Sequence, residues 1–328
     1  MGQVKRRRFL ISAGTLLAAS YSSAWAQVKR HARVGILVFG SSNQVSWRTL
    51  LLHALIDRGW QEGRNLTLDW RSANGVKAKL AEDAADLARG NSDLVIAVTA
   101  SEARAMQHAS RHVPIVVLFC PEDPVEAGFA HSIARPGGNM TGVLWGDAPF
   151  ELKAIQMIKE IFPQLQRIGD IYPAEAYIER KENAREVAAR GLNVTELRYP
   201  VRGPEEIAAV LQKAKNDRVE ALRIVMAGAP QAHVDQILAY AKANRLPTIF
   251  LAPKPVERGG LLSYTPSFED VVRIGASLID KVLKGANPGD LPFETPTRYE
   301  LVINLKTAKE LGVSIPPTVL ITADRVIQ

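Results

Sequence analysis

The sequence contains a single cysteine, Cys120, so the chain cannot form a disulfide within itself. Cys120 follows the apolar run Ile115–Phe119, and we expect a buried structural thiol. After residue 26 no stretch reaches 18 uninterrupted apolar residues, so this part should be soluble. A G-x-G-x-x-G motif after the first strand, a phosphate-binding G-x-x-x-x-G-K motif and a G-x-S-x-G nucleophile motif are all missing. These absences argue against a dinucleotide site, a phosphate-binding loop and an α/β hydrolase.

The chain also has little excess of either charge sign after its first 26 residues. The formal net charge is +7, but four basic residues and no acidic ones lie within residues 1–26. The remaining chain has 37 basic and 34 acidic residues, a balance of +3, without a block of Lys and Arg after residue 30. This pattern excludes nucleic acid as the expected partner.

Residues 1–26 have the features of an export signal. Lys5–Arg8 is basic, Phe9–Ala19 is apolar but too short to span a bilayer, and Ala24–Ala26 matches a signal-peptidase site. The arginines fit a twin-arginine signal, and a general secretory signal is the alternative. No cysteine stands directly after the cleavage site, which disfavours a lipid anchor. We expect a protein that begins near Gln27 and works in the periplasm.

The rest of the chain alternates short strands with amphipathic helices. Tightly bounded apolar runs with little polar alternation are typical of parallel strands buried on both faces, and five such runs occur: Val34–Phe39, Leu94–Val98, Ile115–Phe119, Leu222–Met226 and Thr248–Leu251. Four helices should end in a basic residue followed by a glycine in the left-handed conformation, at Gly59, Gly90, Gly191 and Gly285. The predicted fold class is α/β with parallel central sheets.

The order of the elements predicts two similar Rossmann-like lobes. One series of strand–helix units ends near Trp145, a second begins at Arg167, and the C-terminal tail returns to complete both. We assign residues 32–146 and 264–288 to an N-terminal lobe, and residues 147–263 and 289–328 to a C-terminal lobe. Three crossover segments should join the lobes, with hinges near residues 145–150, 262–266 and 288–298.

Catalytic and metal-binding patterns are weak. His108 and His112 are four residues apart on a predicted helix, but no third ligand lies at a suitable spacing, and a solvated helix end is favoured. Glu122 and Asp123 are adjacent in a loop bounded by prolines, so they make a poor acid–base pair. We expect neither an enzyme nor a cofactor.

Five segments carry a resemblance to a known family: Leu55–Leu66, Asp123–Val125, Ala134–Gly142, Gly259–Tyr264 and, most specifically, Pro296–Gly312. They resemble the substrate-binding proteins of ABC importers with the type I periplasmic-binding fold, in the branch that includes tryptophan- and tyrosine-binding proteins. The resemblance spans about residues 33–328. It implies two lobes joined by three segments, a small-molecule ligand held in the cleft, an ABC permease in the inner membrane as partner, and a monomer.

Candidate ligand-binding residues follow from the predicted topology, since ligands of open parallel sheets bind beyond the carboxyl ends of strands. In the first lobe these positions are Ser41, Ser42, Asn43, Thr99, Ala100, Ser101, Phe119 and Asp123. In the second lobe and beside the crossings they are Trp145, Tyr172, Gly228, Pro253 and Tyr264. Hydroxyls and backbone N–H groups at helix starts suit a carboxylate, Asp123 could neutralise an ammonium group, and the aromatic rings could stack on a flat ligand.

Each candidate also has a purely structural interpretation. For Ser41, Ser42 and Ser101, helix capping alone is the alternative to ligand contact. Tyr172 and Tyr264 could be packed at the hinges, and Trp145 could belong to the core. Asp123 could only brace its loop.

The ligand itself is less defined than the fold. Relatives commonly have Asn-Pro where this chain has Tyr172-Pro173, and many have an acidic residue near 227–229, where this chain has Ala-Gly-Ala. An ammonium partner common in the family is therefore missing, so an aromatic carboxylate is as plausible as an amino acid. The predicted function is capture of such a ligand for an ABC importer. The alternative is a periplasmic subunit that senses the ligand for a membrane receptor without transport.

Overall fold

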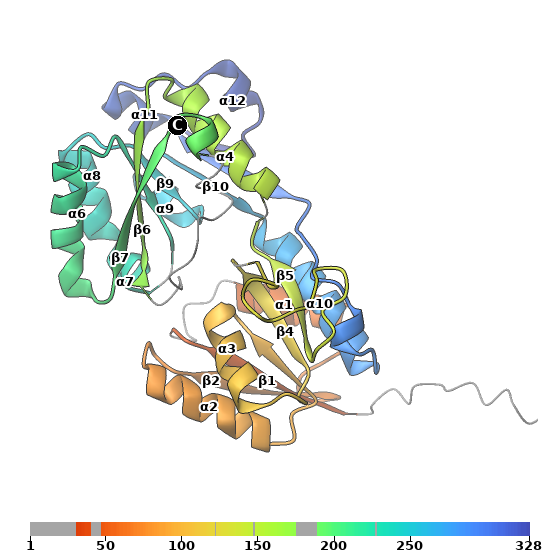
Figure 1. Cartoon of the computed structure of the whole chain (residues 1–328). Helices are drawn as coiled ribbons and strands as arrows, with labels where there is room; N and C mark the ends of the chain where they lie inside the picture. Colours follow the sequence, from red (N-terminus) through yellow and green to blue (C-terminus); the bar gives the residue numbers. More distant parts are fainter. Residues whose placement is uncertain (1–30, 41–46, 122, 147, 175–188, 227) are drawn as a thin grey trace, which may run out of the picture.

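The computed structural model describes residues 31–40, 47–121, 123–146, 148–174, 189–226 and 228–328. These residues form two α/β lobes, and the chain passes between them three times (Figure 1). Each lobe is built on one sheet of mostly parallel strands. The predicted fold class is therefore confirmed. Within the described residues, none of the helices combines the length and the apolar character needed to cross a bilayer.

The first lobe contains a five-stranded parallel sheet in the order β2-β1-β3-β4-β5. Its elements are β1 (Ala32–Val38), α1 (Trp47–Ile56), β2 (Leu66–Ser72), α2 (Lys77–Arg89), β3 (Leu94–Ala97), α3 (Ala100–Ala109), β4 (Ile115–Cys120), β5 (Met140–Leu144), α10 (Phe268–Leu283) and the 3-10 helix η4 (Pro288–Asp290). Helices α1 and α10 cover one face of the sheet, and α2 and α3 cover the other. Both faces are thus buried, which explains the apolar runs of the central strands. Cys120 is buried in this core, as expected.

The second lobe contains a seven-stranded sheet in the order β12-β11-β10-β9-β8-β6-β7, with β10 and β11 antiparallel. Its first elements are α4 (Ala148–Ile161), β6 (Arg167–Pro173), β7 (Thr195–Val201), η3 (Pro204–Glu206), α6 (Ile207–Asn216), β8 (Ala221–Ile224), α7 (Gly228–Ala232), α8 (Val234–Ala243) and β9 (Thr248–Phe250). The remaining ones are α9 (Lys254–Glu257), β10 (Leu262–Pro266), β11 (Tyr299–Asn304), α11 (Leu305–Leu311), α12 (Pro317–Ile321) and β12 (Arg325–Ile327). The strands β7-β6-β8-β9-β10 repeat the order of the first lobe, so the lobes are similar halves with a C-terminal addition.

The three crossings have different partners. Crossing 1 leads from Trp145 into α4, and crossing 2 from Pro266 into α10. Crossing 3 leads from Glu294 into β11. Before it crosses, the chain lies along β5: the backbone N–H of Leu144 donates to the carbonyl oxygen of Glu294 at 2.9 Å, and that of Glu294 donates to Gly142 at 3.0 Å.

These contacts bear on the predicted lobe boundaries. Residues 264–266 pair within the second sheet as part of β10. Residues just before Glu294 remain attached to the first lobe. The division into domains stays a prediction, and the pairing favours shifting its boundaries from 264 to about 267 and from 288 to about 295.

The predicted glycine caps are right at only two of the four helix ends. Gly59 and Gly285 have φ of +87° and +100°, in the left-handed region. Gly90 has φ of −78°, and the left-handed residue there is Asn91, at +57°. At the remaining end the same role falls to Asn193, at +56°. The prediction failed there because asparagine also tolerates this conformation, so the chain can turn one or two residues later.

Candidate ligand-binding site

The carboxyl ends of both sheets lie toward the crossings. Strand β5 ends at Leu144 and β10 ends at Pro266, at two of the places where the chain leaves a lobe. Parallel neighbours end at the same edge of a sheet, so the other strands of the first lobe and β6 to β9 of the second finish there too, whereas β11 and β12 run in the opposite direction. In each lobe the order of strands reverses between the first and third strands, β1 and β3 or β6 and β8. Ligands of open α/β sheets bind at this reversal.

Five aromatic rings line the carboxyl edge of the first lobe, and we call them the aromatic rim: Trp47, Trp70, Phe119, Trp145 and Phe268. Ring centroids are 6.0 Å apart for Trp47 and Trp70, 5.8 Å for Trp47 and Phe119, and 5.3 Å for Phe119 and Trp145. Phe268 contacts both Phe119, at 5.6 Å, and Trp145, at 5.0 Å. Trp47 and Phe119 are buried, whereas the other three are half-buried and so retain exposed ring surface.

The rim contains more than the sequence analysis predicted. Phe119 and Trp145 were candidate residues, and the structure brings them into contact. Trp47, Trp70 and Phe268 were missed. Trp47 and Phe268 each open a helix just after a strand end or crossing, a position that could have identified them. Trp70 lies in the edge strand β2, and only the tertiary fold brings it to Trp47.

A cation lies beside this rim. The guanidinium carbon of Arg48 is 4.2 Å from the centroid of the Trp70 ring, within cation–π distance. Arg48 forms no ion pair within the described part of the chain. The Nε1 of Trp70 is buried and has no hydrogen-bond acceptor among the described residues. This corner of the first lobe thus combines aromatic surface with positive charge.

The loop after β3 is held by a capping box. The hydroxyl of Thr99 accepts from the backbone N–H of Ser101, at 3.4 Å, and the carboxylate of Glu102 accepts from those of Thr99, at 3.0 Å, and Phe39, at 2.6 Å. Burial raises the pKa of the Glu102 carboxyl although these hydrogen bonds oppose the shift. Ala100 is buried. Glu102 therefore ties the end of β1 to the start of α3 at the reversal point.

This arrangement separates two of the candidates. The Thr99 side chain caps α3, a role that the sequence analysis had considered only for the serines. The hydroxyl of Ser101 is half-buried and makes no hydrogen bond to another described residue, so it can serve a ligand. The candidates Ser41, Ser42 and Asn43 lie outside the described residues.

Asp123 is exposed and braces its own loop. Its Oδ1 accepts from the backbone N–H groups of Val125, at 2.7 Å, and Glu126, at 3.1 Å. These contacts match the structural interpretation of this residue. Contact between Asp123 and a ligand stays a prediction.

The candidates of the second lobe offer little polar surface. Tyr172 is 7% exposed near the end of β6, Gly228 is exposed at the start of α7 with φ of +52°, and Pro253 precedes α9 and is half-buried. No side-chain capping hydrogen bond forms at the start of α9. As the sequence indicated, these second-lobe positions present few polar side chains.

Tyr264 lies apart from the aromatic rim. It is 7% exposed in β10 and stacks on Phe150 at 5.1 Å between centroids, within the second lobe. Burial, and secondarily the negative charge of Asp324, raises the pKa of its phenol. Trp145 and Tyr264 were both placed beside the crossings by the sequence analysis, and the structure assigns them to packing groups in different lobes.

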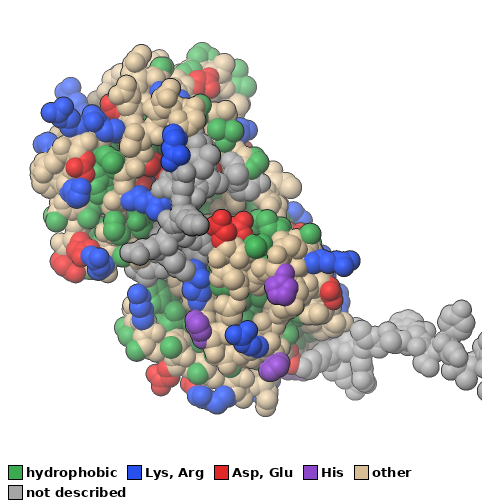
Figure 2. Space-filling view, in the orientation of Figure 1, with side chains coloured by type: hydrophobic (Ala, Val, Ile, Leu, Met, Phe, Trp, Pro, Cys, Tyr) green, Lys and Arg blue, Asp and Glu red, His purple; other side chains and the backbone are tan. Residues whose placement is uncertain are grey.

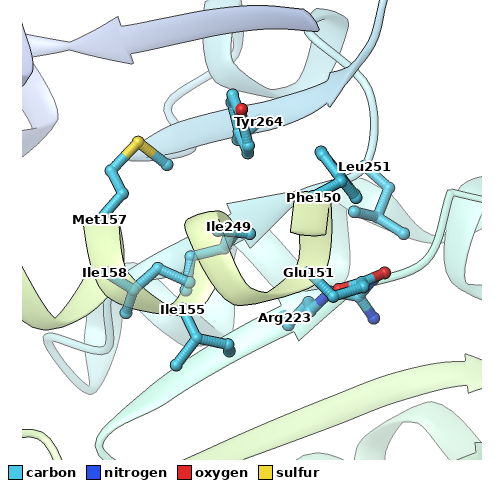
Figure 3. Close-up of a pocket in the computed structure, with 10 residues that line it drawn as sticks. Phe150, Glu151, Ile155, Met157, Ile158, Arg223, Ile249, Leu251 and Tyr264 are labelled. Atoms are coloured by element: carbon cyan, nitrogen blue, oxygen red, sulfur yellow. The ribbon is translucent and has the colours of Figure 1, made fainter. Parts of the chain in front are cut away.

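Tyr264 and Arg223 both line a small pocket, and Arg223 forms a buried ion pair that the sequence analysis missed. The guanidinium of Arg223 contacts Asp170 at 3.0 Å and Glu151 at 3.9 Å, and the first two side chains are 7% and 2% exposed. Figure 3 shows Arg223 and Glu151 side by side in this pocket. The one sequence signal was an arginine within the apolar run of β8. The pair of Arg223 and Asp170 joins β8 to β6, and the contact with Glu151 connects α4 to the sheet just beyond crossing 1.

The described residues contain no cluster of side chains suited to a metal ion. No three His, Cys, Asp or Glu side chains there could hold a metal ion together. His112 instead lines an open groove with Arg111 and His131, near the starts of β4 and β5 and away from the carboxyl edge. Basic and acidic side chains are scattered over the face of both lobes seen in Figure 2.

Comparison with known proteins places this geometry in context. A family model described as ABC transporter substrate binding protein matches residues 34–327. A tyrosine-binding protein of Clostridioides difficile is 25% identical over 270 residues, which cover 79% of this chain and 74% of the relative.

Solved structures share the fold. A Streptococcus pneumoniae ABC domain in complex with L-Trp superposes with a TM-score of 0.78 at 24% identity, covering 90% of this chain and 100% of that one. A conserved domain protein from Vibrio cholerae gives a TM-score of 0.79 at 24% identity, covering 90% and 99%. A solute-binding protein from R. palustris in complex with benzoate gives 0.57 at 13% identity, covering 79% and 82%.

Proposed function

The chain belongs to the family of ABC transporter substrate-binding proteins, and from this premise we propose that it captures an aromatic amino acid or aromatic carboxylate in the periplasm for an ABC importer. The family is one of solute-binding proteins and not of enzymes. The ligand would lie between the lobes, at the carboxyl ends of both sheets. A membrane permease would receive it from the closed form.

The aromatic rim is the observation that carries the choice of ligand. Trp70, Trp145 and Phe268 retain exposed ring surface where ligands of this topology bind. Aromatic rings offset-stack on other flat rings and contribute about 0.5–1.5 kcal/mol beyond the burial of apolar area. A ligand with a ring would use this surface better than a sugar, which needs many hydrogen-bonding groups.

The rest of the site supports a negatively charged ligand. Arg48 provides a guanidinium beside Trp70, and Ser101 provides, at the start of α3, a hydroxyl without a hydrogen-bond partner among the described residues. A carboxylate is favoured near a helix N-terminus and by hydrogen bonds from a guanidinium. Among the ligands named for relatives, L-Trp, tyrosine and benzoate combine a ring with a carboxylate group, whereas leucine has a carboxylate group without a ring.

Capture by this fold requires that the ligand prefer the closed form. A ligand shifts the balance between open and closed lobes only by its difference in affinity for the two. Contacts from both lobes are therefore needed, and in the second lobe the backbone around Gly228 and the ring of Tyr172 are the proposed contributors. Because the second lobe offers few polar side chains, it would bind the ring of the ligand more strongly than its ammonium group.

A thermal-shift screen of the purified protein tests this proposal. The panel contains L-tryptophan, L-tyrosine and benzoate, with L-leucine and glucose as controls without an aromatic ring. A ligand present at about 100 times its Kd adds about 2.7 kcal/mol of stability. A saturable shift confined to the first three supports the proposal, whereas a shift with glucose or leucine alone would contradict the ligand class.

Uptake by cells separates import from sensing. Cells that produce the protein and its permease should accumulate the radiolabelled ligand, and cells lacking only this protein should not. Equal uptake in both, combined with tight binding by the purified protein, would favour the sensing alternative.

A further inference from the structure

Crossings 2 and 3 are joined into one antiparallel ribbon. The β10–β11 ladder ends with Pro266 opposite Tyr299. One step further on, the backbone N–H of Ser267 donates to the carbonyl oxygen of Arg298 at 2.9 Å, so the pairing continues outside the sheet. Two of the three connections between the lobes thus leave the second lobe as a pair.

At its first-lobe end the ribbon is hydrogen-bonded to the carboxylate of Asp270, in the first turn of α10. Its Oδ2 accepts from the backbone N–H groups of Thr297, at 2.8 Å, and Arg298, at 3.1 Å. Its Oδ1 accepts from the guanidinium of Arg273 at 2.6 Å. Asp270 is 2% exposed, so loss of these contacts would leave buried polar groups unpaired. A side chain of the first lobe therefore holds the end of crossing 3.

On the other side of the crossings, one aromatic ring from each connection meets in a stack. Phe150 follows crossing 1, Tyr264 precedes crossing 2 and Tyr299 follows crossing 3. The centroid of Phe150 is 4.8 Å from that of Tyr299 and 5.1 Å from that of Tyr264, with interplanar angles of 12° and 23°. The stacked rings thus fix the second-lobe ends of all three connections next to one another.

Few residues can change backbone conformation between the Asp270 contacts and the ring stack. In the ribbon, the short segment 265–269 joins Tyr264 to Asp270, and Arg298 alone lies between Thr297 and Tyr299. In crossing 1, Gly146 has φ of +92°, and a Cβ there would meet the ring of Phe150 at 2.6 Å. Hinges are a few element-terminal residues that absorb backbone rotation.

We propose that Asp270 is a positioning residue that sets the pivot between the lobes. It binds crossing 3 to α10, so that opening and closing turn about Pro266–Ser267, Arg298–Tyr299 and Gly146, and not within the segment between Glu294 and Thr297. This inference rests on the proposed function only in taking lobe closure as the motion that captures ligand. It predicts a restricted set of lobe orientations even without ligand.

Distances between spin labels on the two lobes test the inference directly. In the full chain with Cys120→Ala, labels are attached at Glu82→Cys in α2 and Gln212→Cys in α6, which are both exposed. Double electron–electron resonance then gives the distribution of interlobe distances in ligand-free protein. Asp270→Ala should broaden this distribution and shift its mean, because the backbone donors of crossing 3 lose their acceptor.

Two variants distinguish positioning from a general effect on α10. Glu269→Ala removes the neighbouring acidic side chain of the same turn, which is 70% exposed and 3.8 Å from Arg298, and should leave the distribution unchanged. Asp270→Asn keeps one acceptor oxygen for crossing 3 and should restore most of the narrow distribution. A second label pair within the first lobe, at Glu82→Cys and Lys281→Cys, confirms that this lobe remains folded.

The outcomes are distinct from those of the ligand screen, since no ligand is present. An unchanged interlobe distribution in Asp270→Ala, with the intralobe distance intact, would overturn the inference whatever the protein binds. Equal broadening in Glu269→Ala would also overturn it. Should Asp270→Ala fail to fold, Thr297→Pro removes one of the two donors from the opposite side and is expected to give the same broadening.

Discussion

The indole of Trp145 packs against the ring of Phe268 with their centroids 5.0 Å apart, although 123 residues separate them in the sequence. Trp145 begins the first crossing between the lobes and Phe268 follows the second. The contact therefore brings half-buried aromatic surface to the edge of the first lobe that faces the crossings. It makes Trp145 the most informative single position for testing the ligand class.

Trp145→Ala should weaken binding of L-tryptophan by about tenfold, because loss of one aromatic contact is worth about 1 kcal/mol beyond its apolar area. Isothermal titration calorimetry measures the change, and Trp145→Phe should lose less. Phe162→Ala is the control, since this half-buried ring lies beyond the far end of α4. Equal losses in both alanine variants would argue against a role for the rim in binding.

Ser101→Ala should separate ligand binding from helix capping. The Ser101 hydroxyl has no hydrogen-bond partner among the described residues, whereas that of Thr99 caps α3. We expect Ser101→Ala to reduce ligand affinity and leave the unfolding free energy unchanged. Thr99→Ala should instead lower the unfolding free energy by about 1 kcal/mol. Urea denaturation and calorimetry of both variants check this, and unchanged affinity in Ser101→Ala would remove Ser101 from the site.

Asp170→Asn should destabilise the second lobe strongly. Arg223 would keep a buried charge without its main partner, and breaking a buried pair in this way costs about 3–5 kcal/mol. Chemical denaturation gives the value. The exposed pair of Arg89 and Asp86 supplies the control, because Asp86→Asn should cost about 1 kcal/mol or less. A small effect at Asp170 would show that the pair contributes little to the lobe.

The pH dependence of stability should reveal the lowered pKa of Asp270. Burial opposes its ionisation, but hydrogen bonds from Arg273, Thr297 and Arg298 outweigh it and lower the pKa below the ordinary 3.8. The unfolded chain therefore binds this proton more tightly than the folded one, so the stabilisation is present above pH 3.8 and is lost as the pH falls through the folded value.

Unfolding free energies of the wild type and Asp270→Asn, measured across the acid range, test this expectation. Their difference should be constant above pH 3.8 and should shrink below it. Glu269→Gln should follow the wild type, since its side chain is 70% exposed. A difference that grows on acidification would contradict the direction of the shift.

Apolar runs in the sequence identify the central strands but not the edge strands. The central strands β3 and β4 are buried along their whole length, and their apolar runs identify them. Strands β2 and β7 lie at the sheet edges and carry charged residues such as Asp69 and Arg198, so the search for apolar runs passed over them. Polar side chains are tolerated there because one edge of such a strand faces water.

The sequence by itself determined the fold class, the two similar halves and the absence of an internal disulfide. These properties depend on local patterns, such as the apolar run ending at Cys120, which is buried as expected. It also placed Phe119 and Trp145 among the candidates at the cleft, because the strand ends follow from the repeated α/β units, and the structure brings the two rings into contact.

Only the tertiary structure decided which side chains share an environment. Asp170 and Arg223 lie on adjacent strands 53 residues apart, and Asp270 meets Thr297 across two crossings, so neither contact has a local signature. The structure likewise separates Trp145 from Tyr264, although both flank crossings. Such pairings depend on which face of a strand or helix meets which neighbour, and that is fixed only when the elements pack together.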